Sequence, residues 1–423
     1  MPEIILSVNA GSSSVKISVY ETNSSATTPV QLAEAVVEGL TAPPARLNYS
    51  RGDHRTKGQE LEHVSTQQEA FRHILDHLAR DEGLPQLRKK EDIHFTCHRV
   101  VHGGDFPHSQ VIDDDTYHRI AELSDLAPLH NAPALSIIEA TSKLLPTAIN
   151  IAFFDSSFHH TLPAHISTYP IDQTVARRNK LRKYGFHGIS YQFITSAVAH
   201  HLKKPTDELN IIALHLGSGA SACCIRKGAS YDTSMGLTPL AGLPGATRSG
   251  SIDPSLMFHF THSAGSLSHE STATMHITQA EEILNKRSGW KSLTGTTDFG
   301  KISAGERDED RLAFDIFVDR IQNYVAPYFT KLDGKVDALV FAGGIGEKGA
   351  KLRAAVVQGV KCLGFELDEQ KNEEPGEDVV VDISKDGARY KTLICRTDEQ
   401  LQMARRVLEE PERFERGRRE KAK

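Results

Sequence analysis

Two short turns rich in glycine and serine carry the clearest chemical signal in the sequence. The first, Asn9–Ser14, joins two apolar strands and is followed by Lys16; the second, Gly217–Gly219, has His215 before it and Ser221 after it. Such turns expose backbone N–H groups and hydroxyls that bind phosphate oxygens. Neither is a Walker A loop, because G-x-x-x-x-G-K-[ST] is absent and a strand follows where a helix is required. A plain hairpin turn is the alternative for each, but two matching turns in one chain strengthen each other.

A third glycine-rich segment, Gly343–Gly346, joins an apolar strand to a helix. Glycine allows a nucleotide to approach the backbone closely, and a helix N-terminus favours negative charge. The segment lacks G-x-G-x-x-G and comes late in the chain, which disfavours a Rossmann site. We therefore predict a third anion-binding segment of another kind, with ordinary turn chemistry as the alternative.

Two arginines and one histidine stand among small residues. Arg99 precedes Gly103 and Gly104, Arg248 lies within 245–250, and His187 is flanked by the glycines of Gly185–Gly188. The guanidinium fork matches a carboxylate or a phosphate, and small neighbours leave it free to enter a cleft. The alternatives are a surface ion pair for each arginine and a structural role for the histidine.

Two acids lie at the ends of elements. Asp155 ends an apolar strand, where ligand groups of α/β folds gather, although a helix cap would also explain it. Glu399 follows Thr397, and we predict a capping box with Thr397 as N-cap and Gln400 at N3, which needs no metal. No G-x-S-x-G elbow is present, so we predict no nucleophilic triad.

The composition limits the partners. The 423 residues suffice for two or three domains, and 39% hydrophobic with 25% charged residues excludes collagen, coiled coil and general disorder. A net charge of -6 lacks the basic excess expected for binding to nucleic acid or to an anionic membrane. Any anionic ligand must therefore be bound by a few placed cations and N–H groups.

The chain has no sign of export. No run approaches the roughly 18–20 apolar residues of a spanning helix, and the first ten residues have no basic n-region. The five cysteines are odd in number and show no C-x-x-C spacing, which favours neither disulfides nor zinc; Cys223 and Cys224 fit a buried strand. We predict a reduced, cytoplasmic protein without a membrane partner.

Strand and helix patterns alternate along the chain, which predicts an α/β fold. Two strand–turn–strand segments about 200 residues apart suggest two related halves. Residues 43–59 are predicted to be a loop or weak surface hairpin, Ser263–Thr274 a loop, and the charged tail after Pro411 a frayed end. The predicted strands are Ile4–Val8, Val15–Tyr20, Phe95–Val101, Asn150–Phe154, Ile211–Leu216, Ala220–Ile225 and Val336–Phe341, and the predicted helices are Gln67–Ala79, Ala134–Leu144, Arg311–Val325 and one ending near Gly359.

Taken together and in this order, the motifs resemble the acetate kinase (acetokinase) family. Any one of them is weak, but the ordered set is specific, and it runs from Asn9 to Glu399. The motifs are Asn9–Ser14 with Lys16, His98–Gly104, Leu126–Asn131, Phe154-Asp155, Tyr184–Gly188, His215–Gly219, Thr238–Pro254, Gly343–Glu347 and Thr397–Glu399.

The resemblance implies an α/β, two-lobed, duplicated fold of the sugar kinase/Hsp70/actin (ribonuclease H-like) superfamily, with the active-site cleft between the lobes. It places residues 1–155 with 400–423 in an N-terminal lobe and residues 156–399 in a C-terminal, nucleotide-binding lobe. It implies direct in-line phosphoryl transfer, ATP + acetate ⇌ ADP + acetyl phosphate, with Mg²⁺, for which Mn²⁺ substitutes. A cytoplasmic homodimer is also expected from it.

The resemblance also assigns roles to residues. Arg99 and Arg248 would hold the carboxylate and the transferring phosphoryl, His187 would donate a hydrogen bond to that group, and Asp155 would lie beside the metal and Arg248. Asn9 and Glu399 would place Mg²⁺, directly or through water. The methyl pocket would be lined by Val101, Leu129, Phe186 and Pro239. The nucleotide or its phosphates would contact Ser14, Lys16, His215, Leu216, Gly217, Ser218, Gly219, Asp298, Gly343, Gly344, Ile345, Gly346 and Glu347.

The chemistry agrees with these residue types. A carboxylate nucleophile with a pKa near ~4–5 is already ionised at neutral pH, so no general base is required. What remains is to bring two anions together and to stabilise charge on the transferring group, by positioning and electrostatics.

Three positions depart from the bacterial and archaeal pattern of the family. Ser218, Gly300 and Lys348 stand where Asn, Arg and Asn are usual, all on the nucleotide side. We predict retained acetate chemistry with altered adenine recognition, and pyrophosphate as donor in the extreme. The alternatives are a propionate or other short-chain carboxylate kinase, separated by pocket volume, and a non-enzymatic Hsp70/actin-like ATP-binding module. Such a module has no need of Arg99, His187 and Arg248 together.

Overall fold

The computed structural model describes residues 2–22, 28–123, 128–271 and 276–414, and for residues 128–130 the backbone only. The chain divides into two units, residues 1–157 with 398–423 and residues 158–397. Each unit is described by itself below. No helix in the described ranges is long and apolar enough to cross a membrane.

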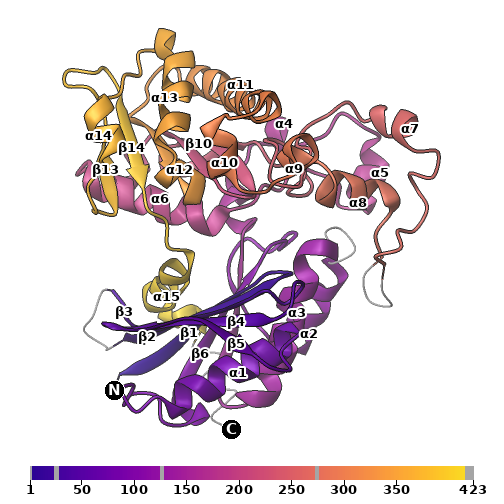
Figure 1. Ribbon diagram of the computed structural model, residues 1–423, viewed down its shortest axis with the longest axis vertical. Helices are drawn as coiled ribbons and strands as arrows, with labels where there is room; N and C mark the ends of the chain where they lie inside the picture. Colours follow the sequence, from indigo (N-terminus) through magenta and orange to yellow (C-terminus); the bar gives the residue numbers. More distant parts are fainter. Residues whose placement is uncertain (1, 23–27, 124–127, 272–275, 415–423) are drawn as a thin grey trace. The chain divides into compact units, whose positions relative to one another are not determined.

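The first unit is built on one mixed sheet (Figure 1). Its strands stand in the order β5-β4-β3-β2-β1-β6-β8-β7, antiparallel from β5 to β1, parallel through β1, β6 and β8, with β7 antiparallel at the edge. The elements are β1 Glu3–Ala10, β2 Ser14–Thr22, β3 Val30–Glu38, β4 Ala45–Arg51, β5 His54–Leu61, α1 Gln67–Arg80, β6 Ile93–Val100, β7 Gln110–Val111, α2 Asp114–Glu122, α3 Pro128–Leu144, β8 Ile149–Phe154 and α15 Glu399–Glu409.

The second unit repeats this layout. Its sheet has the order β11-β10-β9-β12-β14-β13, in which β11, β10 and β9 are antiparallel neighbours and β9, β12 and β14 run parallel. The elements are α4 Ala164–Ser167, α5 Gln173–Arg178, α6 Gly188–His201, β9 Ile211–Leu216, β10 Ala220–Arg226, β11 Ala229–Thr233, α7 Leu256–Phe260, α8 Gln279–Lys286, α9 Gly289–Thr294, α10 Phe299–Ala304, α11 Asp308–Lys331, β12 Ala338–Ala342, α12 Gly343–Lys348, α13 Ala350–Gly359, α14 Glu369–Glu373, β13 Val380–Asp382 and β14 Lys391–Cys395. The two related halves predicted from the twin hairpins are present as two sheets with the same sequence of strand relations.

Alternation along the strands decides which helices cover each face of the first sheet. Leu6 and Val8 of β1 and Ile17 of β2 share a core with Phe71 and Ile74 of α1. The residues between them, such as Ser7, point to the opposite face, where α15 lies (Figure 1).

Gln400 attaches α15 to that face. Its side chain, 4% exposed, donates to the carbonyls of Ser7 at 2.9 Å and Lys16 at 3.3 Å and accepts from Ser18 Oγ at 2.9 Å; Ser7 Oγ donates to the Gln400 carbonyl at 2.8 Å. The predicted capping box is therefore wrong. Asp398 is the N-cap of α15, accepting from Leu401 N at 2.8 Å, because Gln400 is needed as the buried tether.

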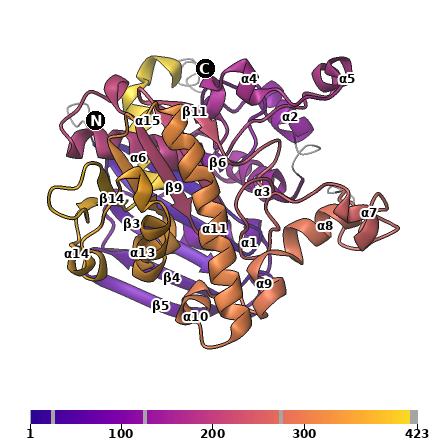
Figure 2. The same cartoon turned by 90° about the horizontal axis from the view of Figure 1, so that it is seen from above.

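The long helix α11 covers the second sheet (Figure 2). Its residues Phe317 and Ile321 pack with Leu214 of β9 and with Trp290, the single tryptophan, which is 2% exposed. Aromatic contacts extend this core, since the Trp290 ring meets those of Phe299 and Phe317 edge to face with centroids 5.3 and 5.2 Å apart.

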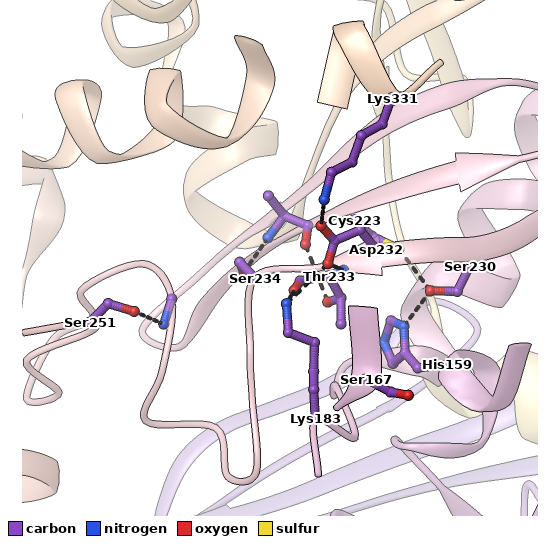
Figure 3. A network of polar contacts seen from close by, with 12 residues as sticks. His159, Ser167, Lys183, Cys223, Ser230, Asp232, Thr233, Ser234, Ser251 and Lys331 are labelled. Atoms are coloured by element: carbon purple, nitrogen blue, oxygen red, sulfur yellow. Dashed lines mark hydrogen bonds and ion pairs between the residues drawn. The ribbon is translucent and has the colours of Figure 1, made fainter. Parts of the chain in front are cut away.

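A polar network fixes the chain that leads into α6 (Figure 3). Asp232, near the end of β11, forms an ion pair with Lys183, whose Nζ lies 3.0 Å from Asp232 Oδ1, and a second ion pair with Lys331 of α11. His159 is fully buried, with Nδ1 at 2.7 Å from Ser230 Oγ and Nε2 at 2.9 Å from the Phe186 carbonyl. Since a carbonyl only accepts, Nε2 carries the proton and the neutral ring holds Phe186 in place.

Most predicted elements are present, with ends shifted by a few residues. Residues 43–59 contain the surface hairpin β4–β5, the helix expected to end near Gly359 is split at Gly349 into α12 and α13, and Cys223 and Cys224 are buried free thiols. Hydrophobic periodicity did not predict α6, because this helix is buried on nearly all sides and so lacks an amphipathic stripe. Residues 272–274 of the predicted loop Ser263–Thr274 and the tail beyond residue 414 lie outside the described residues.

We predict that Gln400→Ala loosens the first unit locally. Several buried partners would lose a hydrogen bond at once, at about 1–3 kcal/mol each when unsatisfied. Amides of β1 and β2 should exchange with deuterium about 100-fold faster, measured by mass spectrometry of peptides covering these strands. Glu409→Ala, on the same helix but exposed, serves as control. Unchanged protection of β1 and β2 in Gln400→Ala would contradict this role.

We also predict that the second unit loses stability in mild acid through His159. Burial lowers its pKa from the ordinary 6.5 to about 4, whereas the unfolded chain protonates it near the ordinary value. The unfolded state thus binds more protons between these two values, so the stabilisation is complete above that window and is lost as the pH falls through it.

The expected loss is about 2 kcal/mol between about pH 7 and about pH 5. Urea denaturation followed by Trp290 fluorescence reports on the same unit. His159→Gln should flatten this pH dependence, while His160→Gln, an exposed neighbour, should leave it. An equally steep dependence in His159→Gln would show that another group is responsible.

Candidate active site

The carboxyl ends of β1, β6 and β8 bring three predicted site residues to one edge of the first sheet. Val8 pairs with His98, and Val100 with Phe154, in parallel register. The next residues, Asn9, Arg99 and Asp155, therefore lie at or beside this edge, the place where ligand groups gather in parallel sheets.

Arg99 bridges two carboxylates at this edge. Its Nη2 and Nε lie 2.7 and 3.1 Å from Asp155 Oδ2, and its Nη1 lies 3.1 Å from Glu399 Oε2 at the start of α15. Asp155 is 1% exposed. Burial alone would lower the pKa of Arg99, but the Asp155 and Glu399 carboxylates outweigh it and raise that pKa, so the guanidinium stays charged.

This cluster has two negative charges and one positive charge, which is unfavourable for binding anions. A divalent cation would reverse the sign. No group of three His, Cys, Asp or Glu side chains suited to a metal occurs among the residues the structure describes. Two carboxylates with the amide oxygen of Asn9 nonetheless fit Mg²⁺, which keeps several waters and takes the rest of its oxygens from substrate phosphates.

The loop after β6 is held by Asn131, which ends the motif Leu126–Asn131, and by Ser156, which the sequence did not single out. Asn131 of α3 accepts from His102 N at 2.9 Å and donates to His102 O at 3.0 Å, and Ser156 Oγ accepts from Gly103 N at 3.0 Å. Val101 lies in this loop, half-buried. Leu129 begins α3, but its side chain is outside the described part of the chain.

In the second unit, Arg248 and His187 come together at Gly219. A Cβ on Gly219 would lie 1.9 Å from Arg248 Nη2 and 3.7 Å from His187 Nε2, so a side chain there would displace the Arg248 guanidinium. Both nitrogens thus lie within 4 Å of one point beside the second phosphate-type turn. The His187 and His215 rings lie against each other, with centroids 4.3 Å apart and their planes tilted by 30°.

The loop that carries Arg248 is joined to the same turn. Ala246 N donates to the Ser218 carbonyl at 2.8 Å, and Arg248 Nη1 donates to the Pro239 carbonyl at 3.1 Å. Phe186, buried, precedes His187, which starts α6 in the left-handed conformation with φ of 57°. The second unit therefore gathers His187, His215, Arg248 and Pro239 around one turn.

The third glycine-rich segment forms α12, directly after β12. Gly343 has φ of 74°, and a Cβ there would lie 2.7 Å from the Leu216 carbonyl oxygen, which brings the segment against the end of β9. Arg353 is buried and donates from Nη1 to the carbonyls of Gly346 and Glu347 at 2.9 and 2.8 Å. Burial lowers the pKa of Arg353 to about 10, so it remains a cation at the carboxyl end of α12. Gly344 and Ile345 lie in the same short helix.

The remaining predicted nucleotide residues have local partners. Lys16 Nζ pairs with Glu34 at 2.8 Å, and Ser14 opens β2 with its carbonyl bonded to Gly11 N at 2.8 Å. Asp298 is the N-cap of α10 and accepts from Gly300 N at 2.9 Å.

Burial raises the pKa of Glu347, whose carboxylate accepts from Thr397 N at 3.3 Å.

Comparison with known proteins gives a consistent result. The profile of the acetokinase family matches residues 4–405. A "probable acetate kinase" of Emericella nidulans is 56% identical over 406 residues, covering 95% of this chain and 96% of that protein. An acetate kinase of Syntrophobacter fumaroxidans is 37% identical, with 96% of each chain covered.

The solved structures agree. Porphyromonas gingivalis acetate kinase matches with a TM-score of 0.81 at 30% identity, covering 96% of this chain and 99% of that one. A propionate kinase of Francisella tularensis matches with a TM-score of 0.82 at 32% identity, covering 95% and 98%. The predicted α/β fold class is confirmed, and the chain belongs to the acetokinase family.

Proposed function

We propose that the protein is an acetate kinase, which transfers a phosphoryl group reversibly between ATP and acetate and gives acetyl phosphate and ADP. The observation that carries the proposal is the meeting of Arg248 Nη2 and His187 Nε2 beside the Gly217–Gly219 turn, in a chain of this family. A guanidinium and an imidazole directed to one point beside a phosphate-type turn suit a group that spreads negative charge over its oxygens during transfer.

Acetate would attack without a general base, because its carboxylate is ionised at neutral pH. Arg99 would bind it by charge, since the guanidinium stays a cation beside Asp155 and Glu399. Phe186 and Pro239, both buried, with Val101 and Leu129 would surround the methyl group. The work of the site is then positioning and charge stabilisation rather than proton transfer.

Asp155 and Glu399, with Asn9, would hold Mg²⁺, and Mn²⁺ is expected to replace it. Bound there, the ion would neutralise phosphate oxygens. The net negative charge of the cluster around Arg99 supports this part of the proposal, because that edge otherwise repels both substrates.

The nucleotide would lie along the three glycine-rich segments, with phosphates at Asn9–Ser14 and at Gly217–Gly219 and the adenosine near Gly343–Glu347. The division into lobes 1–155 with 400–423 and 156–399, the cleft between them, the homodimer and the cytoplasmic location stay predictions. The alternative of a non-enzymatic ATP-binding module gives no reason for Arg248 and His187 to converge, and the acetate kinases among the relatives do not support it.

Propionate is the one alternative acceptor that a specific observation favours. The solved propionate kinase has the same fold at 32% identity. The bulk of Phe186 and Pro239 favours the two-carbon acid, with propionate as a poor second.

Arg248→Ala should lower kcat for acetyl phosphate formation on the order of 10³-fold, as loss of an arginine that stabilises a phosphoryl transition state does. Arg248→Lys keeps the charge but loses the fork and should recover only part of the rate. Arg226→Ala, which removes an exposed ion pair with Asp333 in the same unit, is the control. Full activity in Arg248→Ala would refute the mechanism.

A panel of ATP, GTP and pyrophosphate against acetate, propionate and butyrate, with and without Mg²⁺, tests substrate choice. We expect the highest rate with acetate and a Mg²⁺ requirement. We also expect looser nucleotide selectivity than a strict ATP enzyme shows, because Ser218, Gly300 and Lys348 replace the usual residues. Tight, exclusive use of ATP would contradict the altered recognition, and absence of acetyl phosphate with every donor would contradict the kinase.

A further inference from the structure

Two buried hydroxyls stand in line behind His187. Ser221 Oγ, on β10, lies 2.8 Å from His187 Nδ1, and Tyr191 Oη, on the first turn of α6, lies 2.6 Å from the same Ser221 Oγ. Both hydroxyl-bearing residues are fully buried. Distances alone leave the direction of these hydrogen bonds open, because each hydroxyl can donate or accept.

The tyrosine sets the direction. Burial raises the pKa of Tyr191 well above its ordinary value, so the phenol keeps its proton, and its oxygen accepts the backbone N–H of His215. The rings of Phe158 and His159 pack against it, with centroids 6.4 and 5.7 Å away. Within the described residues, Ser221 Oγ is the acceptor placed to take the phenol proton.

Ser221 then has one proton left to donate. With Tyr191 donating to it, its own O–H is directed at His187 Nδ1, which must be the unprotonated nitrogen of the ring. The reverse order would leave the Tyr191 proton buried without an acceptor, which is costly in a protein interior. The chain of donors therefore runs from His215 N through Tyr191 and Ser221 to His187.

We propose that Tyr191 and Ser221 are positioning residues that hold His187 as the neutral tautomer with its proton on Nε2. This nitrogen is the one that lies beside Gly219 together with Arg248 Nη2. The functional consequence rests on the proposed function: the N–H points to the place of the transferring phosphoryl group, whereas the opposite tautomer would present a lone pair to an anion.

The surroundings of the ring favour a neutral His187. The tilted His215 ring lies against it and has Ser190 Oγ at 2.7 Å from its Nδ1, and the Arg248 guanidinium lies near the same turn. A cation on His187 would face the charge of Arg248, so a neutral N–H donor avoids that repulsion.

Nitrogen-15 NMR of the intact protein with labelled histidine tests the tautomer without any substrate. The His187 signals are identified by their loss in His187→Gln. We expect Nε2 to be protonated and Nδ1 unprotonated in the unaltered protein at mildly alkaline pH. We expect both tautomers in Ser221→Ala and in Tyr191→Phe, which removes a single oxygen and keeps the ring packing. A proton on Nδ1 in the unaltered protein, or an unchanged Nε2–H signal in both variants, would overturn the proposal.

Kinetics test the consequence. Ser221→Ala should lower kcat about 10- to 100-fold, the usual cost of losing a partner that orients a functional histidine, with the KM for acetate within about twofold. Thr195→Val is the matched control, since it removes a buried hydroxyl of α6 that bonds only to the Tyr191 carbonyl, at 2.7 Å.

An equal loss of kcat in Thr195→Val and Ser221→Ala would indicate a merely structural role and would refute the proposal that Ser221 positions His187. Absence of acetyl phosphate formation by the unaltered protein would refute the proposed function, while the NMR result would still decide the tautomer.

Discussion

The guanidinium of Arg99 joins parts of the chain that lie far apart in sequence. Arg99 lies near the end of β6, Asp155 follows β8, and Glu399 begins the last helix, so one cation ties two sheet strands to a returning segment. Burying two carboxylates is costly unless each is paired, and the fork of Arg99 serves both. The hydrogen bonds of Gln400 to Ser7, Ser18 and Lys16 supply the neutral part of the same attachment. Together they bring Glu399 to the sheet edge where Asp155 and Asn9 lie.

The second unit places one arginine and one histidine beside a single turn and supports them mainly with neutral groups. Arg248 and His187 meet beside Gly219, where a side chain would displace the Arg248 guanidinium. The surrounding support is mostly neutral: Ser221 and Tyr191 behind His187, and a neutral His159 holding the preceding carbonyl. Neutral donors orient the functional groups without adding charges that would compete for an anionic substrate.

A protein with net negative charge that binds two anions needs positive charge at the positions where they bind. In the first unit the carboxylates outnumber the arginine, which accounts for the expected dependence on a divalent ion. In the second unit the ionic network at Asp232 lies in the interior, with Lys183 and Lys331 satisfied by its carboxylate. The ion pairs at Asp232 thus stabilise the fold, whereas Arg99 both joins elements of the first unit and would bind the proposed substrate.

Local sequence determined a good part of this protein. Short apolar runs, glycine-rich turns and the order of motifs were enough to predict the α/β class, the twin hairpins, about half of the strands and the family, because these features depend on residues close together in the chain. Tertiary structure alone decided the rest. Gln400 reads as a capping residue until the sheet is present to accept its hydrogen bonds, and Arg353, Asn131 and Tyr191 read as ordinary helix residues. Their partners lie on other elements, and a hydrogen bond between elements leaves no periodic trace in sequence. The proposed tautomer of His187 is likewise decided by tertiary structure, because it depends on which buried groups around the ring can accept a proton.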